Sequence, residues 1–117
     1  MDNDRTLRKF CNTFNHYPVS DEWREELERY IIRGLPPGGF HNALYENDLY
    51  SAALRSHPLN RWDNIQYFMR WLGEYAPPGS FGYKGCTEYW VKLSPEERRT
   101  ICETKGILDT IWELLQD

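Results

Sequence analysis

Apolar side chains recur at helical spacing along most of the chain. Leu7, Phe10, Cys11 and Phe14 stand at positions i, i+3, i+4 and i+7, the repeat that lines one face of an α-helix. Similar apolar stripes follow in the rest of the sequence. The helices that they predict cover, by residue number, about 4–14, 20–34, from within 35–40 to about 56, 60–75, 87–93, 94–106 and 107–116.

Several helix boundaries are marked by residues that start or stop a helix. The segment Ser94-Pro95-Glu96-Glu97 has the sequence of a capping box with proline at the first helical position, and Gly106 closes the helix that it opens. Ser20 is expected to cap the second helix. Pro58 and the pair Pro77-Pro78 end two further helices, because the residue before a proline is pushed out of the helical region.

Strand signals are poor throughout the sequence. Few segments alternate apolar and polar residues with a period of two, and no Asn-Gly or Asp-Gly hairpin turn occurs. A chain of 117 residues, 15% of them aromatic, is expected to form a single domain, 1–117. We therefore predict an all-α fold of five to seven short helices around an aromatic-rich core.

Charge and cysteine content narrow the classes of function. Fourteen basic and eighteen acidic residues give a net charge of -4, which argues against bulk binding to nucleic acid. Three cysteines without a CxxC pair favour a reducing compartment over a secreted disulfide framework. We expect no secretory signal and no membrane-spanning segment, and therefore a cytoplasmic protein.

One five-residue pattern occurs twice, as Pro-Pro-Gly-Gly-Phe at 36–40 and as Pro-Pro-Gly-Ser-Phe at 77–81. The prolines stop the preceding helix, and the following helix begins with backbone N–H groups that lack internal acceptors. Such a turn suits an anion such as phosphate. The alternative is a tight connection between helices in which the phenylalanines only anchor packing. The candidate ligand-binding residues of the two loops are Pro37, Gly38, Gly39, Phe40, Gly79, Ser80 and Phe81.

The helix predicted after the first loop carries polar residues in an apolar stripe. One face combines Phe40, Ala43, Leu44, Asn47, Ser51 and Leu54, with Asp48 and Arg55 at its margins. Asn47 and Asp48 either line a pocket and contact the polar edge of a ligand, or cap and brace the neighbouring loops. Arg55 and Arg61 are candidates to hold phosphate through a bidentate fork, and the alternative for both is solvated surface charge.

Motifs for catalysis and metal binding are missing. The histidines have no metal-ligand spacing, and no P-loop, GxGxxG or GxSxG sequence occurs. We expect no catalytic residue, no metal and no cofactor, and free cysteines that serve as small buried side chains. The many tyrosines and tryptophans offer surfaces on which bases can stack, although most are expected in the core.

Several short motifs carry a family resemblance: Gly-Leu-Pro-Pro-Gly-Gly-Phe at 34–40, Ala43-Leu44, Glu-Asn-Asp-Leu at 46–49, Trp71-Leu72, 76–82 and Trp90. Over 33–90 the chain resembles a group of small phage-encoded proteins of unassigned function. It departs from that group at the second loop, where tryptophan often replaces Phe81 and Ser-Pro-Glu follows. The resemblance implies a phage origin and a location in the host bacterial cytoplasm.

Two hypotheses of function remain. By analogy with small acidic helical phage proteins, the first is an anti-defence protein that sequesters a nucleotide-type signalling molecule without catalysis. Phosphates would bind at the Pro-Pro-Gly loops and bases between aromatic side chains. A homo-oligomer is one expectation, because such pockets are often built where two copies meet. The second is a protein–protein inhibitor of a host enzyme that uses an exposed patch of aromatic side chains and arginine.

Overall fold

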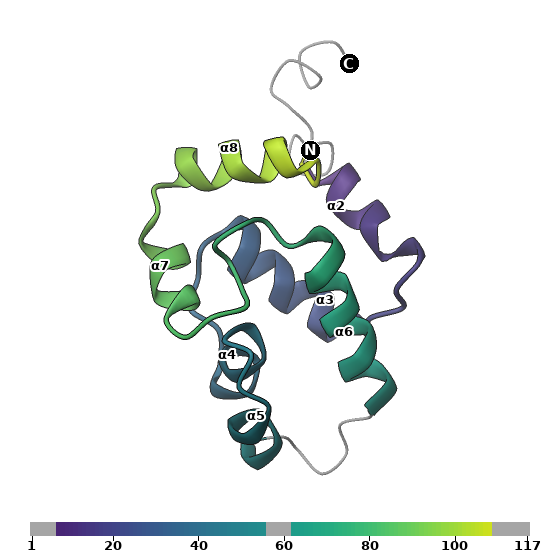
Figure 1. The fold of residues 1–117 in the computed structure, drawn as a ribbon. Coiled ribbons are helices and arrows are strands. Elements are labelled where there is room, and N and C mark those ends of the chain that lie inside the picture. The colour runs from purple at the N-terminus through teal and green to yellow at the C-terminus, as the bar shows by residue number, and fades with distance from the viewer. Residues whose placement is uncertain (1–6, 56–61, 109–117) are drawn as a thin grey trace.

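The computed structural model describes residues 7–55 and 62–108, and all regular structure in these two ranges is helical (Figure 1). Within them the chain forms seven α-helices, a 3₁₀ turn (η1) and a π-helical turn (η2). The elements are α2 (Arg8–Asn12), η1 (Thr13–Asn15), α3 (Asp21–Leu27), η2 (Glu28–Ile32), α4 (Gly39–Tyr45), α5 (Leu49–Arg55), α6 (Trp62–Tyr75), α7 (Cys86–Lys92) and α8 (Pro95–Lys105). The predicted all-α fold is confirmed for these residues.

The helices are arranged around α3, which crosses the middle of the molecule in Figure 1. Helix α6 flanks it on one side, and α7 and α8 bend around the other. Helices α4 and α5 lie together at the end of the molecule away from α2 and α8. None of the helices in the described ranges combines the length and apolar character needed to cross a membrane.

The capping box at the start of α8 is formed as predicted. The Ser94 hydroxyl accepts a hydrogen bond from the Glu97 amide at 3.1 Å, and the Glu97 carboxylate accepts one from the Ser94 amide at 3.0 Å. Gly106 ends the helix with a φ of 89°. The strongest boundary signals of the sequence therefore act locally, and tertiary packing does not override them.

The predicted cap at Ser20 is wrong in its hydrogen bond. Ser20 does occupy the N-cap position of α3, but its side chain does not bond the first amides of that helix. The hydroxyl instead accepts a hydrogen bond from the Asn64 side-chain amide at 3.1 Å, and the Asn64 side-chain oxygen accepts one from the Ser20 amide at 3.0 Å. The pair ties the start of α3 to α6, which is a tertiary contact that local sequence does not show.

The third predicted helix is two helices, and this corrects the expected continuous helix to residue 56. The chain breaks at Asn47, which has a φ of 60°. The Asn47 amide donates to the Leu44 carbonyl at 3.1 Å, and the Asp48 amide donates to the Ala43 carbonyl at 2.8 Å. These two bonds form a Schellman motif, which ends α4. Asp48 then begins α5, because its carboxylate accepts a hydrogen bond from the Ser51 amide at 3.0 Å.

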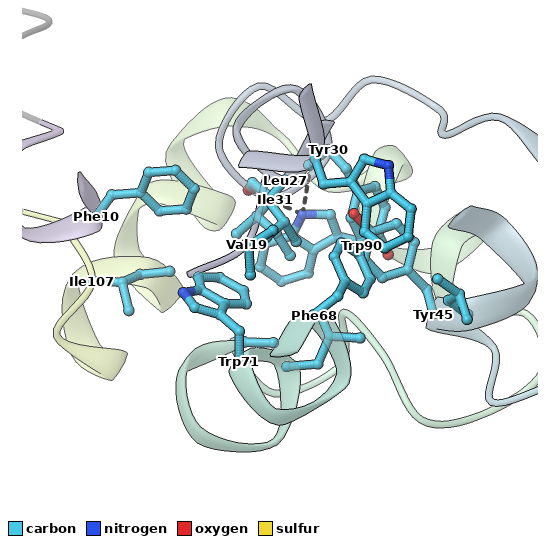
Figure 2. Close-up of a cluster of buried hydrophobic side chains, with 14 of the residues drawn as sticks. Phe10, Val19, Leu27, Tyr30, Ile31, Tyr45, Phe68, Trp71, Trp90 and Ile107 are labelled. Carbon is cyan, nitrogen blue, oxygen red and sulfur yellow. Dashed lines mark hydrogen bonds between the residues drawn. The ribbon is translucent and has the colours of Figure 1, made fainter. Parts of the chain in front are cut away.

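The core is built from large aromatic side chains whose polar tips find partners (Figure 2). Trp71 donates from Nε1 to the Thr13 hydroxyl at 2.7 Å. Trp90 donates from Nε1 to the carbonyls of Tyr30 and Ile31 at 3.2 and 3.1 Å. Both carbonyls belong to η2, where the helix winds more widely than an α-helix. The aromatic-rich core is therefore also the means by which a buried helix end is satisfied.

Three predicted segments lie partly or wholly outside the described residues. They are the first residues of the first helix (4–6), the chain around Pro58 and Arg61 (56–61), and most of the last helix (109–116). Within the described part, Ile107 and Leu108 are buried against the core.

Candidate functional site

The first Pro-Pro-Gly loop leads directly into α4. Gly38 is the N-cap residue with extended backbone, φ -70° and ψ 169°, and α4 begins at Gly39. No side chain of the described residues caps this end of the helix. Gly38 and Gly39 are both exposed, so an external group can approach the first amides of α4. The start of α4 therefore lacks a side-chain cap and is flanked by two exposed glycines.

Arg55 reaches from the end of α5 to the start of α4. A Cβ atom at Gly39 would lie 2.9 Å from Nη1 of Arg55 and 3.3 Å from its Cδ. The guanidinium can lie this close only because residue 39 has no side chain. A cation at the positive end of a helix is electrostatically unfavourable. The arrangement therefore favours an anion that both positive groups can share.

Phe40 and His41 turn inward from the same loop onto the aromatic core. The ring centroids of Phe40 and Trp23 are 5.5 Å apart, and those of His41 and Trp23 are 4.9 Å apart. Nε2 of His41 is buried and has no hydrogen-bond partner among the residues that the structure describes. Burial, and secondarily the charge of Arg29, lowers the pKa of His41 to about 4. His41 is therefore neutral at pH 7 and packs as an aromatic side chain behind the first loop. No sequence motif marks it as part of this site, because the histidines lack metal-ligand spacing.

Asn47 and Asp48 brace the chain between α4 and α5. Their backbone amides complete the Schellman motif, and the Asp48 carboxylate caps α5. The hydrogen bonds from Ser51 lower the pKa of Asp48 below its ordinary value. Both residues are exposed rather than set in an apolar face. Of the two roles considered for them, the structure supports the bracing role.

In the second Pro-Pro-Gly loop the Ser80 amide is hydrogen-bonded inside the protein, contrary to the expectation that the amides of both loops face outward. The Ser80 amide donates to the Pro77 carbonyl at 3.1 Å, and the Gly82 amide donates to the Tyr45 carbonyl at 2.6 Å. Ser80 is completely buried, with its hydroxyl bonded to the Pro77 carbonyl at 2.7 Å. The next helix begins only at Cys86, so no helix N-terminus lies at this loop.

Gly79 and Phe81 serve the packing of the second loop. The Tyr89 ring would lie 2.8 Å from a Cβ atom at Gly79, and the Tyr83 hydroxyl donates to the Gly79 carbonyl at 3.1 Å. Phe81 packs, half-buried, against the core. The buried Tyr30 hydroxyl also donates to the Ser80 carbonyl at 2.6 Å. Gly79, Ser80 and Phe81 are thus all engaged in contacts with other parts of the chain.

The structure brings four of the candidate residues together: Gly38, Gly39, Phe40 and Arg55. Pro37 precedes them in the loop and is half-buried. Asn47 and Asp48 brace the α4–α5 connection, and Gly79, Ser80 and Phe81 belong to the engaged second loop. Arg61 lies outside the described residues. We call the group of Gly38, Gly39 and Arg55 the first-loop site.

Helix α5 exposes a row of large apolar side chains, which the sequence prediction had missed. Leu49, Tyr50 and Leu54 are 64%, 75% and 70% exposed, whereas Ala52 is 2% exposed. Leu54 had been expected on the same face as Leu44, which is buried. The break at residues 46–48 rotates α5 relative to α4, and the continuous projection therefore fails. Trp62, at the start of α6, is a further exposed aromatic residue.

A small cavity of about 280 Å³ lies near the start of α2 and α8 and is also lined by residues at the end of η2. Its lining includes Leu7, Ile32, Arg33, Glu96, Arg99 and Leu108. Arg33 pairs with Glu28 at 2.9 Å and Arg99 with Glu103 at 2.8 Å. None of the candidate residues of the sequence prediction lines it.

The titratable side chains form no metal-binding group in the part of the chain that the structure describes. No group of three or more His, Cys, Asp or Glu side chains there could hold a metal ion. Cys86 and Cys102 are buried, as expected of small core side chains, and Cys11 is exposed. Burial raises the pKa of Cys102 to about 12 and also raises that of Cys86, so neither thiol is activated.

Comparison with protein-family models, with curated proteins and with solved structures finds no match to this chain. The resemblance to small phage-encoded proteins stays a prediction. What the first-loop site can bind is inferred below from its own residues and geometry.

Proposed function

We propose that this chain is a non-catalytic binding protein that sequesters a phosphate-bearing, nucleotide-type signalling molecule at the first-loop site. The observation that carries the proposal is the contact between Arg55 and Gly39 at the uncapped start of α4. Two positive groups meet there on an exposed corner of the molecule. A phosphate group would accept hydrogen bonds from the guanidinium and from the first amides of the helix.

The biological setting of the proposal comes from the resemblance to small phage-encoded proteins. Bound signal would be withdrawn from a host defence pathway in the bacterial cytoplasm, so tight binding without turnover would suffice. Exposed aromatic side chains such as Tyr89 support the nucleotide class, because a base stacked on an aromatic ring gains about 1–3 kcal/mol.

Thermal unfolding in the presence of nucleotides tests this function. A nucleotide at 100 times its dissociation constant stabilises the folded state by about 2.7 kcal/mol. We expect such stabilisation by one or more cyclic or linear nucleotides and none by the matching nucleosides, which lack phosphate. Arg55→Gln should abolish it. The matched control is Arg70→Gln, which removes an exposed arginine from α6 and should leave it unchanged.

Three results would contradict the proposal. Absence of stabilisation by a broad nucleotide panel, or equal stabilisation of the Arg55→Gln variant, would rule out nucleotide binding at the first-loop site. Conversion of a bound nucleotide to product would show that the protein is an enzyme. Mass spectrometry of small molecules released from the purified protein would identify the ligand class directly.

The second candidate function, a protein–protein inhibitor of a host enzyme, draws on the exposed side chains of α5. It requires that this face stays open in the purified protein until the enzyme binds. Co-purification of one host enzyme with the wild-type chain, lost in the Leu54→Glu variant and kept in Arg55→Gln, would favour it over sequestration of a nucleotide.

A further inference from the structure

Helix α5 is amphipathic, but its apolar side faces solvent instead of the core. At 100° per residue, Leu49, Tyr50, Ala53 and Leu54 fall on one side of the helix. That side faces solvent, with exposed fractions of 64%, 75% and 70% for Leu49, Tyr50 and Leu54. The opposite side carries Ser51, Ala52 and Arg55, and of these only the small Ala52 is buried. A helix that turns its apolar side outward is typical of an interface.

The local structure holds this apolar side in one orientation. Asp48 caps the start of α5, and the Schellman motif at Asn47 sets the angle at which the helix leaves α4. At the other end Arg55 lies on Gly39. Because the helix is fixed at both ends, its apolar side is a preformed surface, which lowers the conformational cost of binding. We call the side formed by Leu49, Tyr50, Ala53 and Leu54 the α5 face.

We propose that the α5 face pairs with the same face of a second copy of this chain. Leu49, Tyr50 and Leu54 together expose on the order of 400 Å², about half of the roughly 800 Å² that each partner contributes to a standard interface. Trp62, which is 69% exposed and begins α6, is a further exposed aromatic residue.

The composition of the α5 face fits a two-fold symmetric pair. The face carries no charge, so two copies of a protein with a net charge of -4 meet there without opposing like charges. Ala53 is a small residue among larger ones, and it lets two crossing helices approach while leucine and tyrosine side chains fill the space beside it.

Sedimentation equilibrium of the purified protein over micromolar to millimolar concentration tests the pairing. The wild-type chain is expected to be a dimer. Leu54→Glu places a charge in the interface twice per dimer and should weaken association at least about 100-fold. The matched control is Leu35→Glu, since Leu35 is also an exposed leucine, 48% exposed, but precedes the first loop and lies off the α5 face. It should leave the dimer intact.

A cross-linking experiment locates the contact and guards against a variant that misfolds. In a Cys11→Ser background, which removes the exposed native thiol, Ala53→Cys should form a disulfide between copies under mild oxidation. Far-ultraviolet circular dichroism should show that Leu54→Glu keeps its helices. A monomeric wild-type chain throughout the concentration range would overturn the proposal and leave the α5 face to a different protein. A dimer that survives Leu54→Glu in folded form would overturn it as well. Neither result depends on whether a nucleotide binds.

Discussion

The guanidinium of Arg98 occupies the space that a side chain at Gly34 would need. Gly34 ends the π-helical turn with a φ of 69°, and Arg98 is 6% exposed. Nη1 of Arg98 donates to the Leu93 carbonyl at 2.6 Å, and Nη2 donates to the Arg33 carbonyl at 3.2 Å. The absence of a side chain at one residue thus allows a buried arginine to join the end of η2 to the start of α8.

Gly34→Ala is therefore expected to be strongly destabilising. The left-handed backbone costs about 1–2 kcal/mol for alanine, and displacing Arg98 from a buried hydrogen bond costs about 1.5–3 kcal/mol more. Urea unfolding measures the sum. Gly106→Ala is the control, because Gly106 has a φ of 89° but no atom within 4 Å of the added methyl group. Equal losses in the two variants would show that Arg98 does not depend on the space at Gly34.

His41 should make the protein less stable as the pH falls below 6.5. Its pKa is lowered to about 4 by burial, whereas in the unfolded chain it returns to an ordinary 6.5. The unfolded state therefore binds the proton first, and up to about 3 kcal/mol of stability is lost as the pH falls from 6.5 to 4. Urea unfolding at several pH values measures this slope.

The variant His41→Leu should remove most of that slope, since leucine cannot take up a proton. His16→Leu, at an exposed histidine, is the control and should change the slope little. If wild type and His41→Leu lost stability in parallel between pH 6.5 and 4, protonation of His41 would not be the cause.

Much of the fold could be predicted because local residues determine where many of the helices begin and end. The capping box at 94–97, Gly106 and the proline pair at 77–78 all act where the sequence places them. The break at Asn47 could not be found in this way, because the apolar repeat continues across it. The left-handed conformation of Asn47 depends on two backbone hydrogen bonds that form only when α4 ends there.

The candidate site, like the fold, could be predicted from the sequence only in part. The residue types of the first loop and Arg55 indicated an anion site, and the structure does bring Arg55 onto Gly39. The two loops nevertheless match at four of the five positions of the pattern and differ in their surroundings. Ser80 is drawn into the core by the Tyr30 hydroxyl, which is 50 residues away in sequence. Which amides stay accessible is thus set by long-range packing, and so is the outward orientation of α5.

The buried Glu26 carboxyl should oppose His41 in the pH dependence of stability. Burial raises the pKa of Glu26, although the hydrogen bond from the Tyr45 hydroxyl acts in the other direction. The folded state therefore binds this proton more readily than the unfolded state. The stability that it contributes is fully present below the ordinary pKa of 4.5 and is lost as the pH rises through the raised pKa.

Glu26→Gln keeps an acceptor for the Tyr45 hydroxyl and removes the charge, so it should be more stable than wild type at pH 8 and show no advantage at pH 4. Tyr45→Phe removes the donor and should cost about 1–3 kcal/mol more at pH 8 than at pH 4, because an ionised carboxylate is then left buried without its partner. Thermal unfolding at the two pH values measures both. A Tyr45→Phe penalty that is the same at pH 4 and pH 8 would mean that Glu26 stays protonated throughout.

Trp90 should stabilise the π-helical turn as well as the core. Its Nε1 donates to two carbonyls of η2, those of Tyr30 and Ile31. Trp90→Phe removes this donor; the Tyr30 carbonyl keeps the bond from the Gly34 amide, but the Ile31 carbonyl is left buried with only the long contact from the Cys102 thiol at 3.9 Å. The variant should therefore lower the free energy of unfolding by about 2–4 kcal/mol. Trp23→Phe takes a similar volume from the same core and should cost about 1–2 kcal/mol less.

Amide hydrogen exchange gives a second measure of the role of Trp90. In Trp90→Phe the amides of Arg33 and Gly34, which bond to carbonyls of η2, should lose protection before those of α8. If the two tryptophan variants were equally destabilised and exchange in the turn were unchanged, Trp90 would act through its volume alone.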